Sequence, residues 1–188
     1  MTYLTKNVLL NYRDYLKKIF PQSLGYIING ELIIKIPSNK IIRLLSFLKN
    51  HTNSQYKILI DICAVDYLFK KNRFEVIYNL LSIAYNSRIT ISIFVNEKTA
   101  VDSCVNVYSA AGWFEREVWD MFGIFFTGHN DLRRILTDYG FKGHPLRKDF
   151  PLVGFTELYY SHRVKRLVYL PVILVKKMKL YKKNTPWY

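Results

Sequence analysis

The sequence lacks an apolar run long enough to cross a membrane as a helix. Such a helix needs roughly 20 consecutive apolar residues. The longest candidate, residues 167–175, is about half that length and contains Pro171. We therefore expect no transmembrane segment.

Cysteine is also scarce. Cys63 and Cys104 each lie in an apolar stretch with no second cysteine nearby, which excludes a disulfide framework and the closely spaced thiolates of zinc and iron–sulfur sites. His129, His144 and His162 are too scattered to supply the missing ligands. We expect reduced, buried thiols in a reducing compartment, and no metal site.

Glycine-rich phosphate loops are absent as well. The glycines of the C-terminal half punctuate turns and do not lie between a strand and the start of a helix: Gly123, Gly128, Gly140 and Gly143. The sequence therefore predicts no nucleotide-binding loop.

Acidic residues are few, because 14 Asp and Glu stand against 28 Lys and Arg and leave a formal net charge of +14. This excess favours a polyanion, an anionic membrane surface or an acidic protein as the partner. An AT-rich coding genome, such as organelles often have, would also enrich lysine. The charge alone identifies no function.

The 188 residues are 50% hydrophobic, which is enough for one compact domain with a substantial core. Helical spacing of apolar residues predicts helices over residues 5–20, 38–50 and 97–111. The Asn29-Gly30 turn predicts a hairpin over 26–36, because both residues tolerate a positive φ. Three more strands are predicted over 56–69, 73–83 and 88–95. This order indicates an α+β fold, with helices on one face of a mainly antiparallel sheet.

Residues 112–152, here called the charged segment, contain six acidic and six basic residues and are formally neutral. These charges alternate with aromatic residues, and a charge removed from water needs a partner. We expect a network of ion pairs that holds an irregular segment in place. The predicted organisation is a core domain (1–111), the charged segment packed on the core and on a partner (112–152), and a basic tail (153–188).

The tail carries much of the excess charge. Residues 155–188 contain eight basic residues and a single acidic one, Glu157. With Pro171 and Pro186 interrupting regular structure, we expect an extended C-terminal arm that lies on a partner.

The start of the charged segment has the spacing of a helix that ends at Gly123. Glu115 and Glu117 would lie about 200° apart around it, so they cannot act together as a carboxylate pair. Arg116 and Asp120 are four residues apart and can pair on one face, although such a pair adds at most a few tenths of a kcal/mol. We assign no catalytic, cofactor-binding or metal-binding residue to this chain.

Two later stretches are predicted to make contacts. Asn130 or Asp131 would cap a short helix over 132–136, in which Arg133 and Arg134 point to different sides. One arginine would then face an internal carboxylate while the other is free for a partner. Prolines keep residues 144–151 extended, so we expect this stretch to dock against another surface.

The residues of the charged segment form an ordered pattern. It runs Glu115-Arg116-Glu117, Asp120-Met121-Phe122-Gly123, His129, Asp131-Leu132-Arg133-Arg134 and Gly143-His144-Pro145-Leu146-Arg147-Lys148-Asp149. This pattern resembles the signature of the NuoC-type family of respiratory NADH:ubiquinone oxidoreductase (complex I), which is the thirty-kilodalton component of its peripheral arm.

The resemblance implies a non-catalytic structural subunit of the enzyme that passes electrons from NADH to ubiquinone. It implies that flavin, iron–sulfur clusters and ubiquinone are bound by partner subunits, and that the quinone-site subunit is the main contact. The implied location is the matrix side of the mitochondrial inner membrane, with an organelle-encoded chain and no nucleic-acid partner. Two departures from the family pattern are Asn130, where a proline is usual, and the apolar stretch 170–174, where the family tail is acidic.

Two alternatives remain open at this point. The basic charge and the aromatics Tyr159, Tyr160 and Trp187 are also typical of an organellar RNA- or ribosome-binding protein, although this interpretation leaves the neutral charged segment unexplained. A plastid or bacterial member of the same family, with a different electron donor, fits the same residues.

Overall fold

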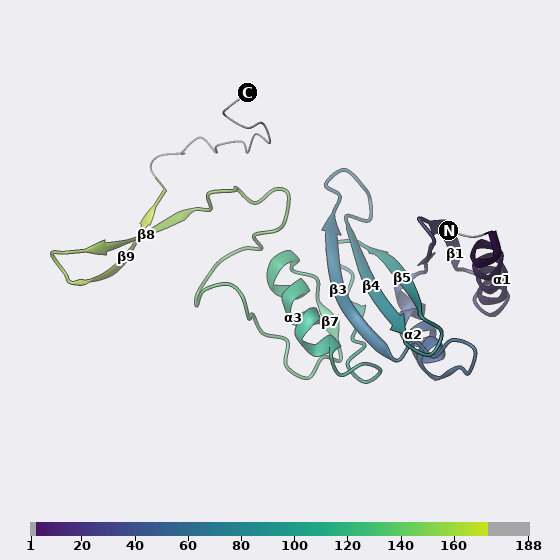
Figure 1. Ribbon diagram of the computed structural model, residues 1–188. Helices are drawn as coiled ribbons and strands as arrows, with labels where there is room; N and C mark the ends of the chain where they lie inside the picture. The colour runs from purple at the N-terminus through teal and green to yellow at the C-terminus, as the bar shows by residue number, and fades with distance from the viewer. Residues whose placement is uncertain (1–2, 173–188) are drawn as a thin grey trace, which may run out of the picture. The chain divides into compact units, whose positions relative to one another are not determined.

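The structure, a computed structural model, describes residues 3–172 (Figure 1). The chain divides into two compact units, Met1–Lys148 and Asp149–Tyr188. The boundaries expected at 111/112 and 152/153 mark changes in sequence character and stay predictions.

The first unit contains the expected N-terminal helices and strands. Its elements are α1 (Tyr3–Ile19), β1 (Leu24–Ile28), β2 (Glu31–Lys35), the 3-10 turn η1 (Ser38–Lys40), α2 (Ile41–Asn50), β3 (Ile58–Asp66), β4 (Phe74–Ser82), β5 (Ser87–Val95), β6 (Val101–Asp102), α3 (Ala111–Phe122) and β7 (Phe126–Thr127).

A five-stranded sheet in the order β1-β2-β5-β4-β3 forms the centre of this unit. All neighbouring strands are antiparallel except β2 and β5, which run parallel. The hairpin between β1 and β2 turns at Asn29 (φ 50°) and Gly30 (φ 82°), the two positive φ values that a tight hairpin of this kind requires. The predicted α+β fold with a mainly antiparallel sheet is confirmed.

The core lies on the face of the sheet that α2 covers (Figure 1). Alternate residues of the central strands point into it, among them Val76, Tyr78 and Leu80 of β4 and Ile89, Ile91 and Ile93 of β5. They meet the buried stripe of α2, which consists of Ile41, Leu44, Leu45 and Leu48. The alternate residues of the strands and the residues three or four apart in α2 are therefore buried in the same layer.

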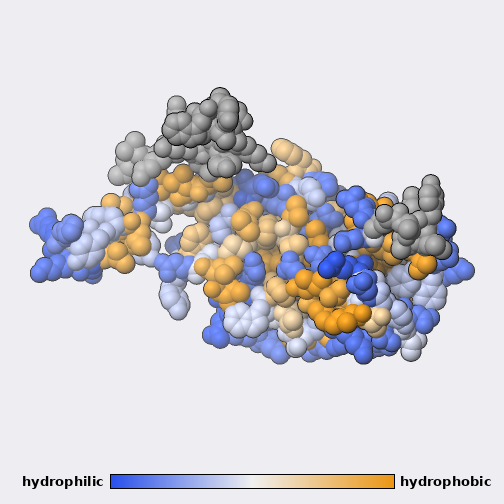
Figure 2. All heavy atoms as spheres, in the orientation of Figure 1, coloured by the Kyte–Doolittle hydropathy of each residue, from blue (hydrophilic) through white to orange (hydrophobic). Residues whose placement is uncertain are grey.

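The other face of the sheet is only partly covered. Figure 2 shows hydrophobic side chains gathered over the strands that face the viewer, and Ile58 and Ile60 of the β3 edge strand are exposed. None of the helices in the described part of the chain has the length and hydrophobicity needed to cross a lipid bilayer.

The prediction of a helix over residues 97–111 is wrong. Val101 instead pairs with Phe126 in the short parallel ladder of β6 and β7, and Asn96 accepts hydrogen bonds from Lys98 N and Thr99 Oγ1 that hold a turn. Cys104 and Tyr108 are buried as a helical stripe would be. They reach the core through turns, because strand pairing with a distant residue outweighs local spacing.

The described part of the second unit is a hairpin of β8 (Thr156–Ser161) and β9 (Arg166–Pro171). The predicted arm is thus extended, but it folds back on itself. Nearly all of its side chains are exposed, and hydrophilic ones gather at its turn (Figure 2). A two-stranded hairpin without a core is marginally stable alone. The rest of the predicted arm, residues 173–188, lies outside the described residues.

Candidate functional site

Helix α3 carries two buried carboxylates that point to different sides. Glu115 shares the core-facing stripe of Ala111, Val118 and Phe122, while Asp120 lies on another side of the helix; both are 0% exposed. An ionised carboxylate removed from water is tolerated only when hydrogen bonds replace its hydration. Each of the two acids therefore needs its own set of donors.

Asp120 receives its hydrogen bonds from the loop that follows β7. Its Oδ2 atom accepts from the backbone amides of Ile135 (3.2 Å), Leu136 (2.8 Å) and Thr137 (2.9 Å), and its Oδ1 atom accepts from the Thr137 hydroxyl (2.7 Å). Burial, the largest single influence, raises the pKa of this carboxyl, but the hydrogen bonds from Thr137, Leu136 and Ile135 together hold it below the usual value. The loop stabilises the charge, and the charge in turn fixes the loop.

This arrangement replaces the short helix that was predicted over residues 132–136. The amides of 135–137 bond to the Asp120 carboxylate and so are not available to helix carbonyls. The expected cap at Asn130 or Asp131 accordingly has no helix to begin. A charged acceptor forms stronger hydrogen bonds than a peptide carbonyl, which explains why the loop conformation is preferred.

Arg133 and Arg134 point to different sides of this loop, as predicted. Arg134 faces the internal carboxylate, with Nη1 3.4 Å from Asp120 Oδ1, while Arg133 pairs at 2.9 Å with the exposed Asp131. The pair of Arg116 and Asp120, which their spacing allows, is not formed. Because Asp120 is enclosed by the loop, Arg116 remains outside and donates to the Arg133 carbonyl at 3.1 Å.

The C-terminal end of α3 is closed by residues 143–148. A helix leaves its last four carbonyls without partners, and here each accepts a hydrogen bond. The four pairs are Trp119 O with Gly123 N (2.9 Å), Asp120 O with His144 Nδ1 (3.1 Å), Met121 O with Leu146 N (3.1 Å) and Phe122 O with Arg147 Nε (2.6 Å). The surface on which the predicted extended stretch docks is thus α3 of the same chain.

Gly123 is required at this helix end for two reasons. Its φ of 76° is left-handed, as is usual for a residue that ends a helix. A Cβ atom here would also lie 2.5 Å from His144 Nε2 and 2.7 Å from Arg147 Nη2. His144 is half-buried, and burial, followed by the charges of Arg147 and Arg134, lowers its pKa despite the bond to Asp120 O.

A second ion-pair cluster joins the charged segment to the sheet. Asp66, at the end of β3, accepts from Arg73 Nε (2.7 Å) and Nη2 (2.8 Å) and from the Lys148 amide (2.8 Å). Glu97 lies 3.8 Å from Arg73 and also pairs with Arg147. The hydrogen bond from Arg73 is the largest cause of the lowered pKa of Asp66.

Sequence reasoning missed Asp66, Arg73 and Glu97. The available signal was an acidic residue at the end of an apolar strand, followed by an arginine just before the next strand, because the two then meet across the hairpin. Their pairing with Arg147 and Lys148 spans a large part of the chain and has no local signal.

Glu115 is satisfied from the opposite side by the turn after β6. It accepts from Ser103 Oγ (2.6 Å) and from the Cys104 amide (2.7 Å), and His129 Nε2 lies 3.9 Å away. His129 Nδ1 accepts from Asp131 N (3.0 Å), and Nε2 is 3.1 Å from the Gly112 carbonyl. Burial, and next the charge of Glu115, raise the pKa of the Cys104 thiol and so favour its neutral form.

The remaining predicted residues have smaller roles. Glu117 is exposed and has no ion-pair or hydrogen-bond partner between residues 3 and 172. The Gly143 carbonyl accepts from Arg134 Nη1 (2.8 Å), and Pro145 is half-buried. Lys148 binds through its amide and exposes its side chain, while Asp149 is exposed and belongs to the second unit.

The outer side of this region presents aromatic and cationic side chains. Trp113 is 69% exposed, the Arg116 guanidinium lies 5.3 Å from the centre of its ring, and Arg116 in turn contacts Arg133. We call these three residues the Trp–Arg surface. Trp and Arg are enriched among the residues that contribute most to protein–protein binding.

The buried acids of the site have partners within the chain. Asp120, Glu115 and Asp66 accept hydrogen bonds from backbone amides, hydroxyls and an arginine. Both cysteines are free thiols; Cys104 is buried as predicted, whereas Cys63 is only half-buried. In the described part of the chain, no three His, Cys, Asp or Glu side chains are placed to hold a metal ion together.

Comparison with known proteins agrees with this geometry. A family model described as "Respiratory-chain NADH dehydrogenase, 30 Kd subunit" matches residues 34–156, which include the end of β2, the strands β3, β4 and β5, and the whole charged segment. The chain is 51% identical over 172 residues to NADH-ubiquinone oxidoreductase subunit 9 of Reclinomonas americana, covering 90% of this chain and 84% of that protein.

Two other relatives are similar over comparable lengths. A subunit of the NADH-quinone oxidoreductase of Paramagnetospirillum magneticum is 46% identical over 177 residues, covering 93% of this chain and 89% of the relative. NADH dehydrogenase (ubiquinone) iron-sulfur protein 3 of Solanum tuberosum is 53% identical over 147 residues, covering 78% and 77%.

Among solved structures, a chain of the membrane-bound sulfane sulfur reductase, an archaeal respiratory membrane complex, is similar with a TM-score of 0.64 and 25% identity. The match covers 74% of this chain and 84% of that one. The alternative of an RNA- or ribosome-binding protein gains no support from any of these similarities.

Proposed function

Because the chain belongs to the family of the respiratory-chain NADH dehydrogenase 30 kDa subunit, we propose that it is a non-catalytic structural subunit in the hydrophilic arm of NADH:ubiquinone oxidoreductase. It has no catalytic residues of its own in this proposal. Its role is to support the subunit that holds the quinone site while electrons pass from NADH to ubiquinone.

The observation that carries this proposal is the division of charges in the charged segment. Asp120 and Glu115 are satisfied within the chain, while the Trp–Arg surface faces outward. A segment whose acids serve its own loops, and whose aromatic and cationic groups are exposed, is built to present a rigid surface to another protein.

The cofactors of the reaction are proposed to lie in partner subunits. An iron–sulfur cluster is normally held by four cysteine thiolates, whereas this sequence has two cysteines in total. One of them, Cys104, is buried beside Glu115. Flavin, iron–sulfur clusters and ubiquinone are thus assigned to neighbouring chains, and the quinone-site subunit to the Trp–Arg surface.

The proposed location is the matrix side of the mitochondrial inner membrane. Relatives include ubiquinone-linked proteins from Reclinomonas americana and Solanum tuberosum. The chain is rich in amino acids whose codons are AT-rich, such as lysine, and this supports an organelle-encoded gene. Attachment to the membrane would pass through the other subunits of the complex.

The proposed function is tested by whether this chain assembles into the respiratory complex. Membranes solubilised in mild detergent and separated on a native gel are expected to show this chain in one band with flavin, iron–sulfur clusters and NADH dehydrogenase activity. A chain recovered only as a free monomer would overturn membership.

The partner surface is tested by Trp113→Ala combined with Arg116→Ala. The double variant should lower the assembled fraction several-fold, since truncation of such residues costs about 2 kcal/mol or more at an interface. Phe69→Ala is the matched control, because Phe69 is a large aromatic residue that is 97% exposed in the turn between β3 and β4. Normal assembly with altered turnover per complex would contradict a purely structural role.

A further inference from the structure

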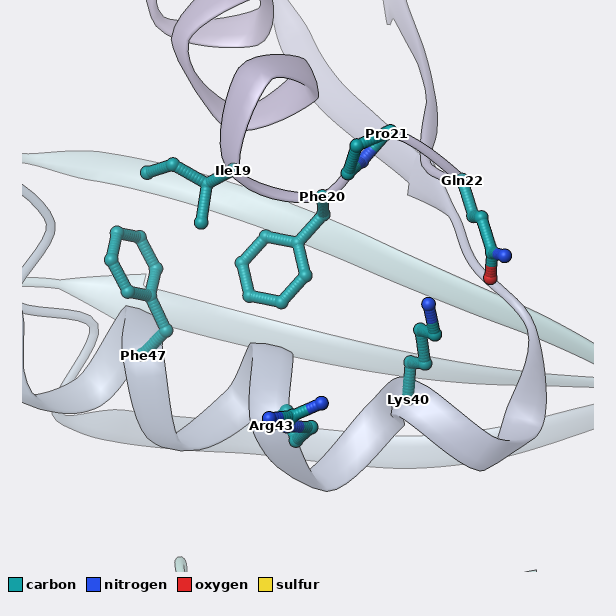
Figure 3. A pocket seen from close by; sticks show the side chains of 7 residues that line it. All are labelled: Ile19, Phe20, Pro21, Gln22, Lys40, Arg43 and Phe47. Carbon is teal, nitrogen blue, oxygen red and sulfur yellow. The ribbon is translucent and has the colours of Figure 1, made fainter.

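A hollow of about 370 Å³ lies between the end of α1 and the side of α2, well away from the charged segment in sequence. Its apolar side is formed by Ile19, Phe20 and Phe47, and the rings of Phe20 and Phe47 meet edge to face with centroids 5.7 Å apart. Lys40 and Arg43 line another side. Figure 3 shows the apolar side chains gathered together and Lys40 extending toward Gln22.

The cations of the hollow have no polar partner in the described part of the chain. Within residues 3–172, neither the Lys40 nor the Arg43 side chain forms an ion pair or a hydrogen bond. Lys17 and Lys18 are exposed on the last turn of α1, and the lining contains no acidic residue. The hollow therefore combines a local excess of positive charge with an apolar wall.

The positive charge and the apolar wall together indicate which kind of molecule can bind in the hollow. A double-helical nucleic acid would bind the cations through its phosphates, but its paired bases would leave the apolar wall uncovered. Residues 173–188 of this chain contain five lysines and no acidic residue, so their charge opposes that of the hollow. A protein segment with an apolar side chain next to carboxylates complements both sides.

We propose that this hollow, the α1–α2 hollow, receives an acidic segment of a neighbouring subunit. An aromatic or aliphatic side chain of that segment would lie against Phe20 and Phe47, with carboxylates paired to Lys40 and Arg43. The proposal rests on the proposed function, because the respiratory complex supplies the neighbouring subunit. It adds a second contact, on different elements from the Trp–Arg surface.

The experiment is photo-crosslinking in the assembled complex. The photoreactive residue p-benzoylphenylalanine replaces Gln22, which is exposed at the rim of the hollow, and the crosslinked peptides are identified by mass spectrometry. The same residue at Lys71, exposed in the β3–β4 turn, provides the background. The expected product joins Gln22 to a peptide of another subunit with net negative charge and at least one aromatic or aliphatic residue.

Charge variants then test the chemistry. Lys40→Glu with Arg43→Glu should reduce that crosslink about tenfold, because two attractive pairs become repulsive. The milder Lys40→Gln with Arg43→Gln should reduce it about threefold, and it guards against a folding defect in the first variant. Lys57→Glu with Lys71→Glu makes the same charge change on other exposed residues and should leave the crosslink unchanged.

Three results would overturn the proposal: a crosslink to a basic peptide, a crosslink only to residues 173–188 of the same chain, or a yield no higher than that from Lys71. Persistence of the crosslink in both charge variants would overturn it too. These failures differ from failure of the proposed function, in which the unmodified chain would be missing from the complex altogether.

Discussion

The two halves of the first unit are held together in different ways. The sheet with α1 and α2 buries apolar residues at regular spacing, such as Leu48 and Tyr78 at 0% exposure. The region made of α3 and the loop 123–148 has little regular structure beyond the helix. There, a few charged side chains bind backbone groups, as Asp120 does with three consecutive amides.

This difference shows how an irregular loop can be made rigid without a core of its own. Apolar burial is non-directional and scales with area, so it fixes a layer but not the path of a loop. A buried carboxylate accepts several directed hydrogen bonds, and an unsatisfied donor beside it would be costly. The loop therefore has one conformation in which its amides are satisfied.

Among the substitutions that test this difference, Asp120→Ala is expected to reduce the stability most. It removes the acceptor for the amides of 135–137 and leaves the neighbouring Arg134 without its internal carboxylate, a loss of roughly 4 kcal/mol. Hydrogen exchange should rise strongly at residues 131–148 and much less in the sheet, and the assembled fraction on a native gel should fall. Glu117→Ala, an exposed acid on the same helix, is the control and should change neither.

Leu48→Ala tests the other half. Leu48 is fully buried in the α2 stripe, so its truncation should cost about 3 kcal/mol through lost contacts and a cavity. Hydrogen exchange should then rise throughout the sheet and α2, because the whole core is weakened. If the exchange pattern matched that of Asp120→Ala, the two halves would not differ in the way described.

Gly123→Ala addresses the end of α3. The left-handed φ and the close approach of His144 and Arg147 make this change unfavourable by about 2 kcal/mol. Urea unfolding should show the loss, together with faster exchange at Leu146 and Arg147. Gly128→Ala is a matched control with φ 78° and no atom within 4 Å of the added Cβ, so it should cost less.

The smallest expected effect is a pH dependence from His144. Its pKa is lowered in the folded protein, so the unfolded chain binds the proton more readily. The stability contributed by the neutral ring is present above the unfolded pKa of about 6.5 and is lost as the pH falls from there through the lower pKa of the folded state. Urea unfolding between about pH 7 and about pH 5 should reveal a loss of roughly a few tenths of a kcal/mol.

The matched variant for this effect is His144→Gln, in which a neutral amide takes the place of the ring and should abolish that part of the pH dependence. His162→Gln, in the second unit, should retain it. An unchanged profile in His144→Gln would assign the pH dependence to another group.

Local patterns predicted the sheet half well. The Asn29-Gly30 turn has the two positive φ values that its residue types indicated, and α2 buries the stripe that its spacing indicated. The same reasoning failed over residues 97–111, where Val101, Val105 and Tyr108 have helical spacing but no helix forms before α3; Val101 lies in β6. Spacing records which residues are buried, and more than one backbone path can bury the same set.

In the charged segment, the sequence identified the participating residues better than their pairings. The sequence predicted that one of Arg133 and Arg134 faces an internal carboxylate, and the structure shows that it is Arg134. The pair of Arg116 and Asp120 that their spacing allows is not formed. Such a pair requires a helix with a free surface, on which residues four apart are neighbours. The loop over Asp120 removes that surface.

The sequence by itself determined the class of fold, the family and the neutral, charge-rich segment around α3. Only the tertiary structure decided where those charges point. The reason lies in the partners: Asp120, Glu115, Asp66 and Arg147 bind backbone amides or carbonyls. Every residue has a carbonyl and nearly every residue has an amide, so no residue type in the sequence marks which of them will be chosen.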